Sequence, residues 1–327
     1  MTAAARAAVQ PATGRLDRLG LAAAGTTALA WGLVGTLVRE IPTLSPREIV
    51  AGRLAFALVA SLPLVAAARV RGELATALRA PAAWALAAML TGYYVVAVIA
   101  FRIAPVAEVA LLIATAPLCA LGMRRIAGER AAPHERQGAA LAVVGVAVTL
   151  VPALRAGMQG GAGAATGAHA LGDGLALVSA VLSAGYALTF QGTQRRAAAR
   201  GRGAPGALGV AVLTFVVGCA GLAAHAVATG VPFVAAAALD RRGWALLALF
   251  GVACTFVPTV GFATASQRLS PVLASASLLL VPVVSAIAAA VALGEVPSGW
   301  LVPGGGLVLV GIVRLLGIGT ARAGAPA

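Results

Sequence analysis

The sequence predicts an all-α integral membrane protein of ten transmembrane helices, arranged as two inverted five-helix repeats. Three observations support this fold class. The 327-residue chain is 61% hydrophobic and only 10% charged, whereas a soluble domain needs far more polar surface. It holds ten apolar runs of about 20 residues, which is the length that crosses the hydrocarbon core of a bilayer. A stretch of the first half also recurs in the second half.

Each apolar run is expected to be a helix, because backbone polar groups in lipid must be hydrogen-bonded within their own segment. The expected spans cover residues 19–38, 49–68, 82–101, 105–123, 135–151, 171–190, 207–229, 244–262, 271–293 and 300–318. The domain boundaries follow from these spans. They place the first repeat at 19–152, the second repeat at 171–318, a Gly-rich linker at 153–170, and cytoplasmic tails at 1–18 and 319–327.

The internal repeat aligns residues 102–145 with residues 268–311, at a constant offset of 166 residues. The matched pairs are Arg102 with Arg268, Pro105 with Pro271, Gly128 with Gly294, Glu129 with Glu295, Gly138 with Gly304, and Gly145 with Gly311. We interpret this register as an ancient duplication. Each half has five spans, an odd number, so the two halves are expected to cross the bilayer in opposite directions, as in many alternating-access transporters.

The net charge of +14 comes from arginine, since the chain has no lysine. With the N-terminus in the cytoplasm, 17 arginines fall on the inner side and 6 on the outer side, so both termini are predicted to be cytoplasmic. The arginines occur singly or in short clusters between apolar runs, which indicates membrane orientation rather than nucleic-acid binding. The absence of lysine and the abundance of alanine and glycine are typical of a G+C-rich bacterial genome, and the predicted location is a bacterial cytoplasmic membrane.

Several short motifs fit one family. They are Trp31-Gly32 in the first span, Arg53 early in the second, and the run from Pro117 through Gly128-Glu129-Arg130. On these residues the chain resembles the drug/metabolite transporter superfamily, specifically the EamA-type exporters, over about residues 19–318. The resemblance implies a basket in which the first four helices of each half surround a central cavity, with the fifth and tenth helices outside. It also implies export of small polar metabolites, often amino acids, by alternating access.

The second repeat departs from the first at two functional positions. Gly294-Glu295 is followed by Val296 instead of arginine, and the seventh span has no counterpart of Arg53. The two halves are therefore not functionally equivalent.

Arg53 and Glu108 are the charged candidates for the substrate cavity, at a similar depth from the outer side. An ionised group inside the bilayer costs about 2.5–3.5 kcal/mol on insertion scales, so Arg53 is expected to face protein, water or substrate. If the two side chains meet, they could lock the outer gate or bind a zwitterionic substrate. Two simpler alternatives remain: Arg53 snorkels to the interface, and Glu108 is an ordinary acidic residue in a first helical turn.

Aromatic side chains and prolines supply the other candidates. Trp31, Tyr93, Tyr94 and Tyr186 lie deep in their spans and are expected to line the cavity, because a tyrosine in lipid favours a hydrogen-bonding partner. Pro117 and Pro282 occupy corresponding spans and are the expected hinges, with static kinks as the alternative. The matched glycines of the fifth and tenth spans are expected to permit close helix packing.

No catalytic, metal or cofactor motif is recognised, so an enzyme is not predicted. His134, His169 and His225 are scattered, the first two in expected loops, and no phosphate loop is present. An ATP-driven pump is disfavoured, and energy is expected from an ion, proton or substrate gradient, with Glu108 as a candidate proton carrier. The small-molecule substrate and the lipid bilayer are the expected partners. The alternatives are an exporter of drugs or other solutes, a lipid-modifying membrane enzyme and a non-transporting scaffold.

Overall fold

The computed structural model describes residues 17–151, 164–201, 203–233, 239–269 and 277–317. Throughout these residues the regular secondary structure is helical. Among them, seven helices are long and apolar enough to cross a membrane, and two further apolar helices are shorter. The prediction of an all-helical, multi-span membrane protein is confirmed at this level, while the count of ten spans stays a prediction.

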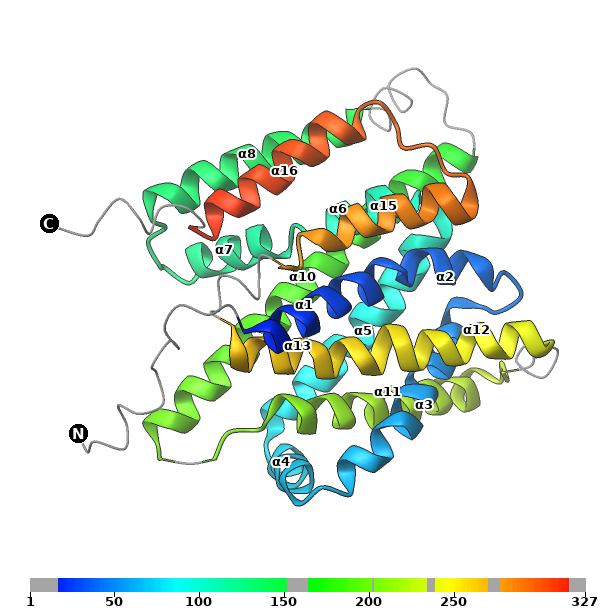
Figure 1. Cartoon of the computed structure of the whole chain (residues 1–327), viewed down its shortest axis with the longest axis vertical. Helices are drawn as coiled ribbons and strands as arrows, with labels where there is room; N and C mark the ends of the chain where they lie inside the picture. Colours follow the sequence, from blue (N-terminus) through cyan, green and yellow to red (C-terminus); the bar gives the residue numbers. More distant parts are fainter. Residues whose placement is uncertain (1–16, 152–163, 202, 234–238, 270–276, 318–327) are drawn as a thin grey trace, which may run out of the picture.

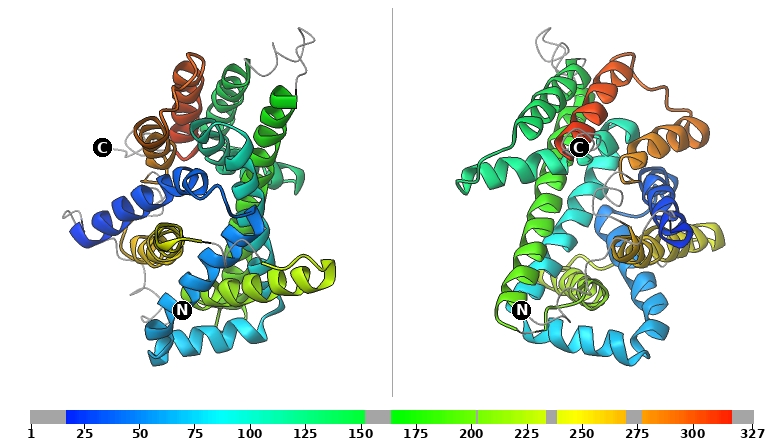
Figure 2. Two further views of the ribbon diagram at one scale, coloured as in Figure 1. Left: turned by 90° about the vertical axis from the view of Figure 1, so that its right-hand side faces the viewer. Right: turned by 60° about the vertical axis from the view of Figure 1, so that its left-hand side comes forward.

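The helices of the first half follow the expected spans closely. They are α1 (Arg18–Gly32), α2 (Val34–Glu40), α3 (Pro46–Val65), α4 (Ala68–Arg79), α5 (Pro81–Ile103), α6 (Val106–Ile113), α7 (Ala116–Ile126) and α8 (Pro133–Thr149). Helices α1 and α2 together form the first span, and α6 and α7 together form the fourth. Helix α4 was not expected; it carries Arg69, Arg71 and Arg79 and runs across one end of the bundle (Figure 2).

The second half contains the longest helix of the described chain. Its elements are α10 (Ala164–Ala199), α11 (Ala207–Thr229), α12 (Arg241–Gly251), a π-helical turn η3 (Val252–Phe256), α13 (Val257–Arg268), α15 (Leu280–Leu293) and α16 (Leu301–Leu315). Helix α10 has 36 residues, or about 54 Å, and begins seven residues before the expected span. The predicted linker is therefore helical from Ala164 onward. Its residues 153–163, residues 1–16 of the first tail and the whole tail 319–327 lie outside the described residues.

The proline positions have different effects on their spans. Pro117 has no N–H to donate, and the fourth span breaks just before it, between α6 and α7. Pro282 lies in the first turn of α15, whereas Pro63 lies inside α3 without ending the helix. Hinge motion at Pro117 and Pro282 stays a prediction.

The two halves interleave within one bundle. Helix α10 packs along α5, α11 packs on α3, α4 and α5, and α1 packs between α13 and α15 (Figure 1). The principal hydrophobic core accordingly draws side chains from both halves, including Leu54, Val98 and Val109 from the first and Phe215 and Phe250 from the second. Any site at the centre is therefore built jointly by the two repeats.

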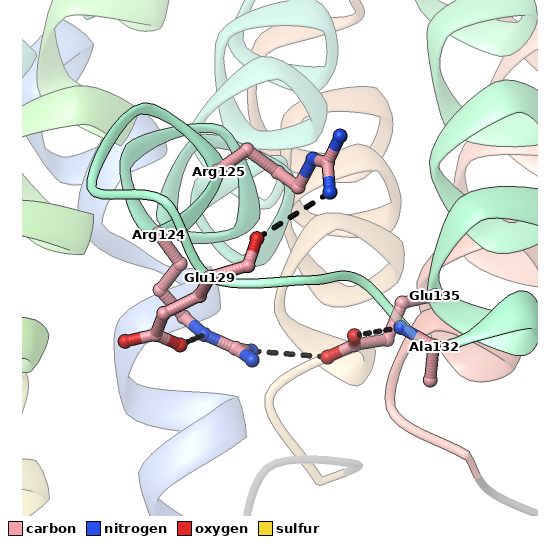
Figure 3. Close-up of polar contacts among 5 residues, drawn as sticks. All are labelled: Arg124, Arg125, Glu129, Ala132 and Glu135. Carbon is pink, nitrogen blue, oxygen red and sulfur yellow. Dashed lines mark hydrogen bonds and ion pairs between the residues drawn. The ribbon is translucent and has the colours of Figure 1, made fainter.

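The turn between α7 and α8 is held by an arginine between two acids (Figure 3). The Arg124 guanidinium bonds the Glu129 carboxylate at 2.7 Å and the Glu135 carboxylate at 3.0 Å. Gly128 adopts a left-handed backbone with φ of +87°, and its repeat partner Gly294 does the same at +66°. The two copies therefore end their spans with the same glycine geometry.

Helices α8 and α16, the last of each half, lie against one another at one edge of the bundle (Figure 1). Their matched glycines face each other directly. A Cβ added at Gly311 would lie 2.5 Å from the Ala142 nitrogen and 2.7 Å from the Gly138 oxygen. A Cβ at Gly145 would lie 2.6 Å from the Gly304 oxygen. The expected packing role of these glycines is confirmed, because only glycine allows the two backbones to approach so closely.

We expect Gly311→Val to destabilise the folded protein, because the new side chain meets backbone atoms that cannot move aside independently of α8. The expected loss is roughly 1–3 kcal/mol, the usual range for overpacking. Thermal unfolding of the detergent-solubilised protein provides the measurement. Gly306→Val on the same helix is the matched control, since a Cβ there meets nothing within 4 Å. Equal unfolding temperatures for the two variants would contradict the contact.

Candidate functional site

Arg53 lies at the centre of the bundle, enclosed by both halves of the chain. Its side chain comes from α3, and the residue is only 2% exposed. The guanidinium carbon lies 4.4 Å from the centre of the Tyr94 ring of α5 and 4.2 Å from the centre of the Phe250 ring of α12. Its Nε donates a 2.9 Å hydrogen bond to the Thr255 hydroxyl oxygen in η3. We call these four residues the Arg53 core.

The backbone of α12 and η3 in the second half has two irregular features next to Arg53. Pro258 has no N–H, so the carbonyl of Cys254 loses its regular helical donor, and the chain widens into the π-helical turn just before it. Thr255 sits in this turn and donates its own proton to the Phe250 carbonyl at 3.0 Å. Gly251 lets α12 come close to α3, because a Cβ there would lie 2.7 Å from the Arg53 carbonyl oxygen.

No carboxylate pairs with Arg53 within the part of the chain that the structure describes. Its two Nη nitrogens donate no hydrogen bond to the described residues either. The contact between Arg53 and Glu108 that the sequence left open is not formed: Arg53 bonds Thr255, and Glu108 bonds His169. The snorkelling alternative also fails, because the arginine is buried among rings and does not reach a surface.

The four aromatic residues expected to line the cavity do not lie together in one place. Tyr93 lies beside Tyr94, with ring centres 5.5 Å apart, at the edge of the Arg53 core. Trp31 packs on Phe262, and Tyr186 stacks on Phe190 in a different hydrophobic cluster. Only Tyr94 of this group contacts Arg53 directly, and a role in substrate contact for the other three stays a prediction.

Glu108 belongs to a second group of polar residues that the sequence analysis missed. Its Oε2 lies 2.7 Å from Nε2 of His169, and the same nitrogen lies 3.6 Å from Oδ2 of Asp173. The expectation that His169 sits in a loop without a partner is wrong, because α10 already includes it. A signal was present in the sequence: His169 and Asp173 are four residues apart, on one face of a helix.

Glu108 and His169 line a cavity of about 460 Å³ between α2, α5, α6, α10 and α15. The other polar side chains on its wall are Arg39, Glu295 and Ser298. The Arg39 guanidinium is bonded to the backbone oxygens of Phe101 and Ala104. We call this space the Glu108 cavity. Of the six side chains expected to line a cavity, Glu108 alone borders this one.

Comparison with known proteins connects this architecture to one family. Residues 18–151 and 170–317 match the EamA-like transporter family. The chain belongs to this family. The two matched segments correspond to the two repeats, so the EamA-like transporter has one family unit in each half.

The fold is also similar to that of a solved protein, described only as "Crystal structure of protein". The similarity has a TM-score of 0.59 at 21% sequence identity, and it covers 93% of this transporter and 98% of that chain. A search of curated proteins found no match. The likeness supports the fold of the EamA-like transporter and leaves its substrate to be argued from the site.

We expect Arg53→Met to leave the transporter as stable as the natural chain or more stable. Two buried cation–π contacts contribute about 2 kcal/mol each, and the cost of burying an ion without a counter-charge, several kcal/mol, offsets this gain. Thermal unfolding in detergent measures the balance, with Arg47→Met near the start of the same helix as the control. A large fall in unfolding temperature for Arg53→Met alone would assign the arginine a structural role.

Proposed function

We propose that this protein is a secondary transporter that exports small polar metabolites, amino acids or related compounds, across the cytoplasmic membrane by alternating access. The Arg53 core is the single observation that supports the proposed substrate class, amino acids and related small polar metabolites. A guanidinium whose two Nη groups bond no described residue, buried at the junction of the halves, offers a paired donor surface that matches a carboxylate. A substrate carboxylate would supply the missing counter-charge.

The same charge disfavours the main alternative within this fold, a multidrug exporter of hydrophobic cations. Like charges repel most strongly where water does not screen them, so a cationic drug would be destabilised beside Arg53. The Tyr94 and Phe250 rings lie against the guanidinium, and its Nη groups are the donors that bond no described residue.

Inverted repeats support the alternating-access part of the proposal. Arg102 donates to the Ile41 and Leu44 oxygens at the end of the first span, while its repeat partner Arg268 bonds Asp17 at the start of that span. Equivalent residues therefore contact opposite ends of one span. Such an arrangement is expected when two copies of a unit cross the bilayer in opposite directions.

The matched pair Glu129 and Glu295 also lies at opposite ends of one span. Glu129 lies just beyond the end of the fourth span and bonds Arg124. Its partner Glu295 accepts a 2.9 Å hydrogen bond from the Val106 nitrogen at the start of that span. Two independent pairs thus favour inversion over a parallel duplication.

The inverted arrangement predicts opposite exposure of two tags. A tag placed just before residue 19 should be cytoplasmic, and a tag within residues 153–163 should be on the outer face, because five spans separate them. Labelling of intact cells with a membrane-impermeant reagent reads the outer face, and permeabilised cells are the control. Both tags on one face would contradict the proposed topology.

Transport itself is tested in proteoliposomes with a radiolabelled panel of acidic and zwitterionic amino acids, hydrophobic cations and uncharged solutes. We expect movement of carboxylate-bearing compounds and a response to an imposed pH gradient if protons couple the cycle. Arg53→Met should reduce this flux at least about tenfold, the loss expected for one charged hydrogen bond. Arg47→Met, at the outer end of the same helix, should retain it.

The outcomes separate the candidate functions. Flux of cations alone, unchanged by Arg53→Met, would favour a drug exporter. Vesicles that move no member of the panel would return the membrane enzyme and the scaffold to consideration.

A further inference from the structure

Three ligand-type side chains converge where α6 and α10 begin. Glu108, His169 and Asp173 each present one ligand atom, and these atoms all lie within 4.8 Å of one another. Glu108 comes from the first half of the chain, and the other two come from successive turns of α10 in the second half. We call them the Glu108 cluster.

The hydrogen bonding of this cluster is incomplete. One ring nitrogen, Nε2 of His169, faces both carboxylates, at 2.7 Å from Glu108 and 3.6 Å from Asp173. A single N–H can be aimed at one of them only. The Asp173 side chain is 6% exposed, and neither of its oxygens accepts a hydrogen bond within the described residues. A buried carboxylate whose oxygens accept no hydrogen bond is destabilised, so a cation at this position would stabilise Asp173.

The chemical types of the three ligand atoms determine which cations the Glu108 cluster would bind. An imidazole nitrogen together with two carboxylate oxygens suits Zn²⁺, Mn²⁺ and related transition ions, whereas Mg²⁺ and Ca²⁺ favour oxygen ligands alone. Catalytic-type zinc sites use three protein ligands and keep one position open. Here the open side faces the Glu108 cavity, and His169 is 30% exposed toward it, which gives an ion a route of entry.

The charges around the cavity agree with cation binding. Glu295 also borders the space, and its carboxylate accepts from the Val106 nitrogen without a basic side chain beside it in the described structure. Besides His169, Arg39 is the one basic side chain on the described wall, and it is bonded to two backbone carbonyls. Three carboxylates against one guanidinium leave the region negative.

We propose that Glu108, His169 and Asp173 bind a divalent transition metal ion at the end of the Glu108 cavity. The ion would replace the proton between the imidazole and the carboxylates and would ligate all three. It would also link α6 to α10, and therefore one half of the chain to the other.

Binding is tested on the purified full chain in nanodiscs, with an affinity tag that contains no histidine. Isothermal titration with Zn²⁺ should give one ion per chain, and Co²⁺ should produce the visible absorption of a bound, non-octahedral ion. Asp173→Asn keeps the side-chain shape and should weaken Zn²⁺ binding at least about tenfold. His169→Ala should abolish the Co²⁺ signal.

The matched control is His225→Ala, which removes an exposed histidine of α11 and should leave both signals unchanged. Thermal unfolding of each variant shows that it is folded. Absence of stoichiometric binding in the natural chain, or equal binding by Asp173→Asn and His225→Ala, would overturn the site. Because binding is measured without transport, its failure leaves the proposed export function untouched.

Discussion

The buried charge of Arg53 explains the local geometry of the helices that meet at the centre of the bundle. An ion inside a bilayer protein must be surrounded by polarisable or polar groups, and for Arg53 of α3 these come from α5, α12 and η3. Gly251 makes the close approach of α12 possible, and Pro258 accounts for the π-helical turn that presents Thr255. Gly251 and Pro258 would each weaken an ordinary helix, and both are explained here by the packing around Arg53.

The duplication is visible in the matched glycine positions of the two halves, but Arg53 has no charged counterpart in the second half. Gly128 and Gly294 share a left-handed conformation, and the glycines of α8 and α16 meet across one interface. In contrast, the position 166 residues after Arg53 is Cys219, an uncharged residue of α11. Glycine and proline positions define the shape of each repeat, and the unique arginine makes the centre of the bundle asymmetric.

Sequence patterns predicted the elements better than the contacts between them. Apolar length located the span 207–229 at the bounds that α11 adopts, and the matched glycines have the packing role expected of them, although the sequence did not show that α8 and α16 pack on each other. Hydropathy gives the depth of a residue in the bilayer but not its rotation about the helix axis, so the sequence could not decide whether Arg53 and Glu108 meet. His169 was missed because the glycine-rich segment that leads into α10 was interpreted as a linker. The four-residue spacing between His169 and Asp173 was therefore not recognised as one helix face.

The separation of the two charged sites fits a protein that must exchange between conformations. A direct bond between Arg53 and Glu108 would hold one arrangement of the helices, since breaking a buried ion pair costs about 3–5 kcal/mol. Each 1.4 kcal/mol shifts a population tenfold, so such a bond would leave the other state at about 1% or less. With Arg53 held by neutral rings and a hydroxyl, and Glu108 held by His169, neither charge locks the other. In the proposed cycle each remains available to a ligand that arrives and leaves.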